Sequence, residues 1–373
     1  MSGKAAIYER LGIDTYINAY ACMTTMGGSI MPPAAVEAMV QASRHHIPLE
    51  DLHDAVGARL AELTGSEAAA VSTGAASGLL LAGAACLTGA DKDLIRKLPH
   101  TGDRPNEFVI SLVDPHYYVH QGFEVAGGRL VEVGTRQQVS PADYAAAIGE
   151  RTAAAVYFLG RQPDDELAEV ADIAHAASVP LIVDAADQLP PRSNLTEVTR
   201  RGADLVVFSG GKGLCGPQAS GLILGRKDLV EACRLNASPH SALGRGMKVG
   251  KEELAGLLVA VEMFMARDEE ELLAEWERRC HVIGAAAEGV DGVETKYYPP
   301  FSERIPPAAP HMELHFSDAA PLSAREANEA LEKGQPGILA IGRDAHIRFA
   351  THTLLEGEAE TIATRLREIL AGS

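Results

Sequence analysis

Apolar residues recur along this chain in two patterns, one typical of helices and the other of strands. Between Leu49 and Leu63 they are three or four residues apart, which is the spacing of one face of an α-helix. Thr64-Gly65 follows, and a glycine directly after the last periodic residue is a helix C-terminal signal. Elsewhere the apolar residues form short uninterrupted runs. We predict strands from these runs at Ala68–Ser72, Phe108–Val113, Leu130–Val133, Ala153–Leu159, Pro180–Val183, Asp204–Phe208 and Gly221–Leu224.

Predicted helices separate several of these strands. One ends at Leu87, one begins at Ser140-Pro141, and one spans Glu166–Ala177. Proline suits the first position of a helix because its missing N–H has no partner there in any case. Strands that are apolar throughout and alternate with helices are typical of a mostly parallel sheet covered on both faces. The sequence therefore predicts an α/β fold with a large domain.

A smaller α+β unit is predicted towards the C-terminus. Lys251–Arg279 is expected to form one long helix or two, and the proline-rich stretch Tyr298–Pro310 is expected to be a loop. The elements predicted after it are a strand, a helix, two strands and a closing helix, at Met312–Phe316, Ala324–Glu332, Gly337–Ile341, Ala345–Ala350 and Glu358–Leu370. We expect a large domain over residues 46–239, an N-terminal segment over 1–45 that packs with the small domain, and a long helix with the small domain over 240–373.

The charge balance excludes one class of partner. The chain has 373 residues with 33 basic and 51 acidic side chains, which gives a net charge of −18. Nucleic-acid binding relies on clustered Lys and Arg that neutralise phosphates, and a large negative charge repels a polyanion at long range. We therefore expect no nucleic-acid partner. A local basic site for a small anion is still compatible with this charge.

Cysteine usage and hydropathy indicate a cytoplasmic protein. The five cysteines are scattered and include no C-x-x-C pair, which is typical of a reducing compartment. No apolar run reaches the ~18 residues of a spanning helix, so we expect no membrane segment. The first residues, MSGKAAIYERLG, lack the apolar core of a signal peptide.

Three polar groups follow predicted strands at the sheet edge where ligands of such folds bind. Thr73 to Gly78 are small residues that open a helix, and exposed N–H groups there can bind phosphate. Asp184 directly follows one strand, and Lys212 follows another in Ser209-Gly210-Gly211-Lys212. Pyridoxal 5′-phosphate needs a lysine for its aldehyde, a carboxylate for its ring nitrogen, and amides and hydroxyls for its phosphate. Gly211 and Gly213 would let the cofactor approach the backbone closely.

Other chemistries have less support. Gly211 to Gly216 matches G-x-G-x-x-G, but a strand follows where the dinucleotide fingerprint requires a helix. His45-His46 and the pair His116 and His120 lack a carboxylate or a third ligand nearby, so we expect no metal site. Taken singly, each of the three polar groups could also serve as a helix start, a strand-end cap or a solvated lysine.

The segment Ser209-Gly210-Gly211-Lys212, followed by Gly216-Pro217 and Gly221, resembles the Schiff-base segment of fold-type-I pyridoxal phosphate enzymes. The resemblance is to the selenocysteine synthase (L-seryl-tRNA(Sec) selenium transferase)-like family, and within it to D-glucosaminate-6-phosphate ammonia-lyase-like proteins. Further matching pieces extend over almost the whole chain. They include Ile17-Asn18-Ala19, Met26-Gly27-Gly28-Ser29, Leu63 to Ala69, Val131 to Gly134, Val183 to Ala186, and Gly244 to Glu252.

The resemblance implies roles for individual residues. Lys212 would bind the cofactor aldehyde and later move the proton at the substrate Cα, and Asp184 would pair with the ring nitrogen. His116 would stack on the ring, as a histidine does in the related cysteine desulfurases, although it could instead cap the strand end. The residues expected to hold the phosphate are Thr73, Gly74, Ala75 and Ser209.

Five basic residues are candidates for an anionic group of the substrate. Arg245, Lys248 and Lys251 form a local cluster that could also contact a neighbouring subunit or lie on a plain helix surface. Arg343 or Arg348 could bind a substrate carboxylate in a bidentate manner. Arg348, in a predicted strand, could equally point to solvent.

Three features depart from the relatives. Selenocysteine synthases carry an additional N-terminal tRNA-binding region, whereas here the enzyme pattern begins by Tyr8, so we expect no tRNA substrate. Cys215 lies in a tight glycine-rich turn, the wrong place for the mobile nucleophile of a desulfurase, and we interpret it as structural. Asp187 stands where desulfurases have a glutamine near the ring hydroxyl. Its effect on the cofactor is left open.

The resemblance favours a lyase that deprotonates Cα of an amino acid or amino-sugar acid and eliminates a β-substituent. A racemase or epimerase, an aminotransferase, and a non-catalytic pyridoxal phosphate-binding homologue are the rival interpretations. We expect a homodimer or larger homo-oligomer, with the N-terminal segment contributing Ala21 to Gly28 to the substrate entrance.

Overall fold

The structure is a computed structural model that describes residues 6–303 and 306–371. Their contacts divide them into a larger unit, residues 23–267 with residue 306, and a smaller unit, residues 6–22, 268–303 and 307–371. These limits differ from the predicted boundaries after residues 45 and 239. The reason is that α2 (Pro33–Ser43) packs along α11 (Lys251–Ala266) within the larger unit.

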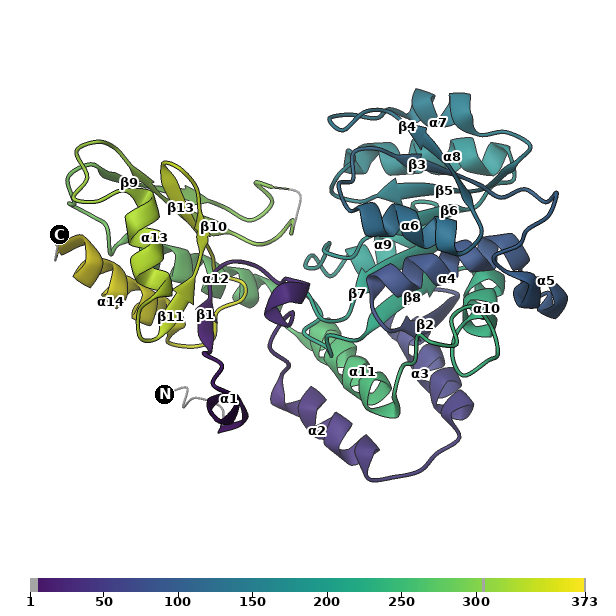
Figure 1. Ribbon diagram of the computed structural model, residues 1–373, viewed down its shortest axis with the longest axis horizontal. Helices are drawn as coiled ribbons and strands as arrows, with labels where there is room; N and C mark the ends of the chain where they lie inside the picture. The colour runs from purple at the N-terminus through teal and green to yellow at the C-terminus, as the bar shows by residue number, and fades with distance from the viewer. Residues whose placement is uncertain (1–5, 304–305, 372–373) are drawn as a thin grey trace. The chain divides into compact units, whose positions relative to one another are not determined.

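Within the described residues, the larger unit is built on a seven-stranded sheet (Figure 1). Its strands are β2 (Ala68–Ser72), β3 (Glu107–Ser111), β4 (Arg129–Val133), β5 (Thr152–Phe158), β6 (Leu181–Asp184), β7 (Leu205–Ser209) and β8 (Gly221–Gly225). They lie in the order β2-β8-β7-β6-β5-β3-β4. Strand β8 is antiparallel to β2 and β7, and the remaining neighbours are parallel. The predicted α/β fold with a mostly parallel sheet is confirmed.

Helices cover both faces of this sheet. They are α3 (Leu49–Thr64), α4 (Ala75–Thr88), α5 (Lys92–Lys97), α6 (Tyr117–Val125), α7 (Pro141–Ala147), α8 (Leu167–Ala176), α9 (Asn194–Arg200) and α10 (Lys227–Asn236), with two 3₁₀ turns, η1 (Thr24–Met26) and η2 (Asp164–Glu166). Val183 and Phe208 pack on one face with α3, α8 and α11, whereas Ile182 and Val207 pack on the other with α4, α6 and α10. Side chains alternate between faces along a strand. Because both faces are buried, these strands are apolar at every position.

All seven strands of this sheet lie within two residues of their predicted bounds. Helices α2, α5, α6, α9 and α10 were not predicted. In α2 the reason is physical: Ala35 is the buried residue of that helix, so no apolar periodicity marks it. Lys251–Arg279, expected to form one helix or two, forms two, because Asp268 caps a new one by accepting a hydrogen bond from the Glu271 N–H at 3.1 Å.

The smaller unit contains a four-stranded antiparallel sheet, in the order β12-β13-β10-β9, and a parallel pair of β1 with β11. Its elements are α1 (Ala6–Leu11), β1 (Tyr16–Asn18), α12 (Glu269–Gly284), β9 (Val293–Tyr298), β10 (His311–Phe316), α13 (Ala324–Glu332), β11 (Gly337–Leu339), β12 (Ile341–Gly342), β13 (His346–Ala350) and α14 (Glu358–Ala371). Strand β9 was not predicted, and its last residue, Tyr298, was assigned to a loop. Ala19 bonds to the backbone of both Leu339 and Ala350, so segments from both ends of the chain build this unit.

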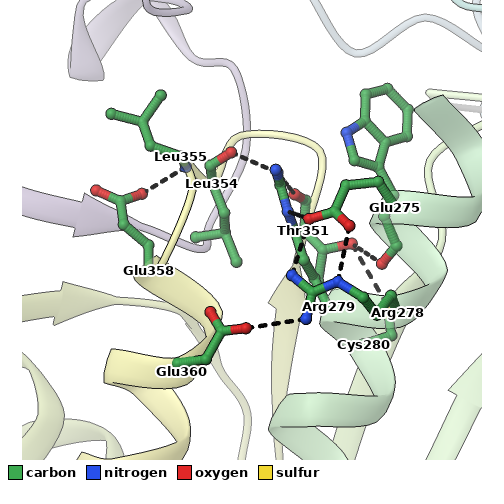
Figure 2. Close-up of polar contacts among 10 residues, drawn as sticks. Glu275, Arg278, Arg279, Cys280, Thr351, Leu354, Leu355, Glu358 and Glu360 are labelled. Carbon is green, nitrogen blue, oxygen red and sulfur yellow. Dashed lines mark hydrogen bonds and ion pairs between the residues drawn. The ribbon is translucent and has the colours of Figure 1, made fainter. Parts of the chain in front are cut away.

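An arginine pair links α12 to the segment before α14 and to α14 itself (Figure 2). Arg279 donates to the Leu354 carbonyl at 2.5 Å and to Glu275 at 2.9 Å. Arg278 donates to Glu275 and to Glu360 of α14 at 2.9 Å. The two differ in burial, since the side chain of Arg279 is 13% exposed and that of Arg278 is 48% exposed. Arg279 is therefore the stronger link.

Arg279→Ala should lower the free energy of unfolding by about 1–2 kcal/mol, because it leaves the buried Leu354 carbonyl without its donor. Arg278→Ala is the matched control, and an exposed ion pair is worth at most about 1 kcal/mol. Urea unfolding of both variants measures the difference. Equal losses in the two variants would contradict the assigned difference in burial.

In the described part of the chain, no helix combines the length and apolar character needed to cross a bilayer. The five cysteines are free thiols in this structure, and Cys22, Cys233 and Cys280 are buried.

Candidate functional site

The carboxyl ends of β2, β6 and β7 lie at one edge of the seven-stranded sheet. Gly221 at the start of β8 pairs with Ser72 on one side and with Ser209 on the other. Asp184 ends β6, the next strand beyond β7. A Cβ added to Gly221 would lie 2.6 Å from the carbonyl carbon of Gly74, so glycine is needed there for the loop after β2 to pack on β8. The register thus brings the predicted phosphate residues and Asp184 to one edge.

Gly74 opens α4 and leaves the first turn of this helix accessible. Its φ of 139° favours glycine, and no atom lies within 4 Å of the position that a Cβ would take. The hydroxyls of Ser72 and Ser77 donate to the Gly74 carbonyl at 2.8 and 2.9 Å, and Thr73 donates to the Ser77 hydroxyl at 3.0 Å. The first N–H groups of a helix have no partner inside the helix. This open turn fits a phosphate group, as predicted for Thr73, Gly74 and Ala75.

The Asp184 carboxylate accepts a hydrogen bond from the Ala186 N–H at 2.9 Å. Burial raises the pKa of Asp184 to about 6. The charge of Asp114 acts in the same direction, while the Ala186 bond and the charges of Lys212 and His116 act against it. A cation beside this carboxylate would restore its ionised form. The protonated ring nitrogen of pyridoxal phosphate is such a cation, so the residue fits the predicted role.

His116 is held by Asp114, a residue to which the sequence pattern gave no role. The Asp114 carboxylate accepts the His116 backbone N–H at 3.1 Å and lies 2.7 Å from the ring Nδ1. The side chain of Asp114 is 3% exposed, whereas that of His116 is 47% exposed. A buried carboxylate therefore fixes an open imidazole ring. Tyr118 lies beside it, with the ring centroids 5.5 Å apart.

Tyr118 was also missed from the sequence. Burial raises the pKa of Tyr118, and the charges of Asp184 and Asp114 raise it further. The sequence did contain a signal, because Tyr118 follows His116 by two residues at the start of α6.

Lys212 lies in a tight loop between β7 and β8. Its Nζ is 3.5 Å from Oδ2 of Asp187, and both side chains are 27% exposed. A Cβ at Gly213 would lie 2.1 Å from the Leu189 carbonyl oxygen, and one at Gly211 would lie 2.8 Å from the Cα of Gln218. These glycines are therefore required by close packing within the protein. That they also let the cofactor approach the backbone stays a prediction.

Cys215 has a φ of 54°, and its N–H donates to the Lys212 carbonyl at 2.9 Å. Burial raises the pKa of its thiol. The thiolate is the nucleophilic form of cysteine, so this environment agrees with the structural interpretation of Cys215.

The N-terminal segment reaches the lysine loop. Ser29 donates to the Gly211 carbonyl through its N–H at 2.8 Å and through its hydroxyl at 3.0 Å. Gly28, at a φ of 78°, has no room for a Cβ because Gln218 and Gly211 lie against it. Ser29 and Gln218 therefore fix the position of the lysine loop. These contacts were missed, because Ser29 and Gly211 are 182 residues apart along the chain.

The predicted anion-binding residues have different environments. Arg245 and Lys248 are exposed, and their side chains have no partner among the described residues. Lys251 differs, because it donates to the Ala42 carbonyl at 2.7 Å and pairs with Glu252 at 3.1 Å, which joins α11 to α2. Lys251 is thus a structural member of the predicted cluster.

The other two candidates belong to the smaller unit. The Arg348 guanidinium binds both oxygens of Glu303, at 3.1 and 2.5 Å, so a substrate carboxylate would have to replace Glu303. Arg343 is exposed in the turn between β12 and β13. Among residues 6–303 and 306–371, no three His, Cys, Asp or Glu side chains form a group suited to a metal ion.

A family model described as SelA: L-seryl-tRNA selenium transferase matches residues 16–275, more than half of the chain. The chain belongs to the L-seryl-tRNA selenium transferase family. The predicted resemblance is confirmed, and this member of the family is a pyridoxal phosphate-dependent enzyme of fold type I.

Relatives of this transferase-family chain align over nearly its whole length. It is 35% identical to 5′-C-glycyluridine monooxygenase-decarboxylase from Streptomyces sp, over 97% of this chain and 92% of that protein. It is 30% identical to D-glucosaminate-6-phosphate ammonia lyase from Salmonella typhimurium, over 97% of both chains. A solved structure of D-glucosaminate-6-phosphate ammonia-lyase matches 99% of each chain, with a TM-score of 0.84 and 27% identity.

Asp184→Asn should stabilise the cofactor-free protein at neutral pH. The pKa of Asp184 is about 6 in the folded protein, above its usual 3.8, so the folded state binds more protons between these values. This group therefore makes wild-type stability fall as the pH rises from about 4 to about 6. The stability of the variant should not fall over this pH range. Urea unfolding at several pH values across the range measures the difference. Asp172→Asn, an exposed residue of α8, should retain the wild-type dependence. If the stability of Asp184→Asn fell with rising pH as that of the wild type does, the assignment of this pH dependence to Asp184 would be contradicted.

Proposed function

We propose that this enzyme is a pyridoxal phosphate-dependent lyase that deprotonates Cα of an amino acid or amino-sugar acid and eliminates a β-substituent. The observation that carries the proposal is the placement of Lys212, Asp184 and the open first turn of α4 at one sheet edge. The 30% identity to an ammonia lyase over 97% of the chain supports the reaction type.

Each residue at this edge would bind a different part of the cofactor. Lys212 would hold the aldehyde carbon, Asp184 the ring nitrogen, and His116 one face of the ring. The phosphate would bind at Thr73, Gly74, Ala75 and Ser209. When bound, pyridoxal phosphate supplies an electron-withdrawing ring that stabilises negative charge at the substrate Cα.

Lys212 would then act as the acid and base of the reaction. Once a substrate amine has taken its place, the free Nζ would remove the proton from Cα and return a proton to the departing group. Nearly three-quarters of the Lys212 side chain is shielded from water, which limits proton exchange with solvent. Asp114 would keep the His116 ring fixed through its bond at 2.7 Å while the substrate changes shape.

Lys212→Ala should abolish the visible absorbance that pyridoxal phosphate gives when bound to the wild-type protein. The reason is that the variant has no amine for the aldehyde carbon at this edge. Absorbance spectra after gel filtration provide the measurement, and circular dichroism checks the fold. A variant that keeps the wild-type spectrum would show that another amine holds the cofactor.

A second candidate function is oxidative decarboxylation of an amino acid. It is favoured by the 35% identity to a protein named as a monooxygenase-decarboxylase, over 97% of this chain. Both reactions would use the same residues around Cα, but they differ in co-substrate and product. The oxidative reaction consumes oxygen and releases carbon dioxide, whereas the lyase forms a keto acid and ammonia.

One assay separates elimination and oxidative decarboxylation from racemisation and transamination. The purified enzyme, loaded with pyridoxal phosphate, is mixed with serine enantiomers and sugar-derived 2-amino acids, with and without oxygen. Keto acid and ammonia formed without oxygen support the lyase. Oxygen-dependent release of carbon dioxide supports the second candidate. Loss of enantiomeric purity without keto acid indicates a racemase or epimerase, and a keto acid formed only with an amino acceptor indicates an aminotransferase.

The substrate is proposed to carry an anionic group that Arg245 and Lys248 bind together. These side chains are exposed and lack partners among the described residues, in a chain whose net charge is −18. The phosphate in the name of one relative's substrate agrees with such a group. Arg343 and Arg348 stay candidates for a carboxylate, with Arg348 the less available because it binds Glu303.

Lys248→Ala and Arg245→Ala should each lower kcat/KM for a phosphorylated amino-sugar acid about tenfold, because a hydrogen bond to a charged group is lost. The same variants should process the unphosphorylated acid at the wild-type rate. Arg136→Ala, which also removes an exposed cation, is the control. Equal losses on both substrates would argue against recognition of the phosphate.

We also propose a cytoplasmic homodimer or larger homo-oligomer. Large exposed apolar side chains are concentrated in the N-terminal fifty residues, and exposed apolar surface is a feature of interfaces. They are Ile7, Tyr8, Leu11, Ile13, Tyr16, Met23, Met26, Ile30, Val36 and Ile47. The five free thiols support a reducing compartment.

A further inference from the structure

Three nitrogen-bearing side chains lie beside β2, the edge strand of the seven-stranded sheet. His53 belongs to α3 and Arg234 to α10, and both helices pack against β2 (Figure 1). His240 follows α10, and its Nδ1 lies 3.7 Å from Oε1 of Glu50 in the first turn of α3. Residues three apart in a helix share a face. The segment after α10 therefore reaches the face of α3 that carries His53.

The His53 ring is buried without a hydrogen bond. The residue is 4% exposed, and neither ring nitrogen has a partner among the described residues. A buried polar group without a partner lowers stability. Burial, followed by the charges of Arg234 and His240, lowers the pKa of His53 to about 4. The ring is therefore neutral at pH 7 and has one N–H donor to offer.

Arg234 adds a positive charge that no neighbouring carboxylate balances. Its Nη1 is buried without a hydrogen bond, and its guanidinium forms no ion pair with any of residues 6–303 and 306–371. Glu50 and Asp54 are exposed and act on it only through their charges. Burial lowers the pKa of Arg234, but an arginine in a protein keeps its proton. Because buried charges are normally paired, a counter-ion is expected here.

We propose that His53, Arg234 and His240 form a binding site for a small oxyanion of the phosphate type. The guanidinium presents its N–H groups in a planar fork that matches phosphate, and each imidazole can donate one more. A phosphate has oxygens on all sides and can accept from all three side chains, whereas a carboxylate offers two oxygens on one side. The site uses none of the residues assigned to the cofactor or the substrate.

Glu50 is the group that the anion would have to replace at His240. The side chain of Glu50 is 58% exposed and that of His240 is 32% exposed, so this side of the site is open to solvent. An ion pair between exposed groups contributes little to stability. Exchanging Glu50 for phosphate therefore loses little, and the phosphate gains the buried donors of Arg234 and His53.

The first experiment titrates inorganic phosphate into the enzyme loaded with pyridoxal phosphate, in phosphate-free buffer, and measures binding by calorimetry. Arg234→Gln should lower the affinity at least about tenfold, because a hydrogen bond to a charged group is lost. Arg136→Gln, which removes an exposed arginine, is the matched control and should bind as the wild type does. Acetate should bind the wild type at least about tenfold more weakly than phosphate.

Three results would overturn the proposal: a wild type that binds no phosphate, an Arg234→Gln variant that binds it as the wild type does, and acetate binding as tight as that of phosphate. If Lys248→Ala lost the binding and Arg234→Gln kept it, the phosphate would belong to the proposed substrate region, which also overturns the proposal. The titration measures no catalysis, so the proposed lyase function stands or falls separately.

The second experiment separates a ligand site from a structural role of Arg234. Without phosphate, Arg234→Met should unfold at the same urea concentration as the wild type or a higher one, because an unbalanced buried charge is removed. Phosphate should raise the urea midpoint of the wild type more than that of the variant, since a ligand stabilises the state that binds it. A variant that is less stable without phosphate, or that changes oligomeric state in light scattering, would show that a protein carboxylate already pairs with Arg234 and would overturn the proposal.

Discussion

The close packing of Gly221 against Gly74 and Ser72 determines where the candidate site forms. A Cβ at residue 221 would lie 2.6 Å from the carbonyl carbon of Gly74 and 2.6 Å from the hydroxyl oxygen of Ser72. Strand β8 can therefore pack against the loop after β2 only if residue 221 is glycine. Because β8 is antiparallel between β2 and β7, the carboxyl ends of those two strands lie on either side of its first residue. The lysine loop, which joins β7 to β8, therefore returns beside the open end of α4. Any larger residue at 221 would separate the two groups that the cofactor must connect.

The buried acid at this edge lowers the stability of the protein when the cofactor is absent. Asp184, Asp187 and Asp114 lie around Lys212 and His116, and burial raises the pKa of Asp184 to about 6. A protonated ring nitrogen would compensate the Asp184 carboxylate, so cofactor binding and stability are linked by mass action. Asp184 would therefore favour the loaded enzyme over the empty one, which is the usual compromise between stability and function at a site.

The sequence predicted the strands and the main site residues because these depend on local pattern. Strands buried on both faces are apolar throughout, and Asp184 and Lys212 are adjacent to them. The contacts of Asp187 with Lys212 and of Ser29 with Gly211 depend on tertiary packing and leave no local signal. Arg348 shows the same limit: its strand was predicted, but its pairing with Glu303 crosses a loop that no periodicity describes. For Lys251–Arg279 the sequence left one helix or two open, and the Asp268 cap at the start of α12 shows that there are two.

Two relatives named for different reactions each align with 97% of this chain, so the fold does not decide between eliminating a β-substituent and using oxygen to remove carbon dioxide. The glycines at 74, 213 and 221 are fixed by backbone conformation or packing and cannot vary with the reaction. What can vary is the set of side chains that reach the open edge, among them Tyr118 and Asp187. The side chains around Lys212 and Asp184, more than the backbone that carries them, are therefore where members of this family can differ in reaction.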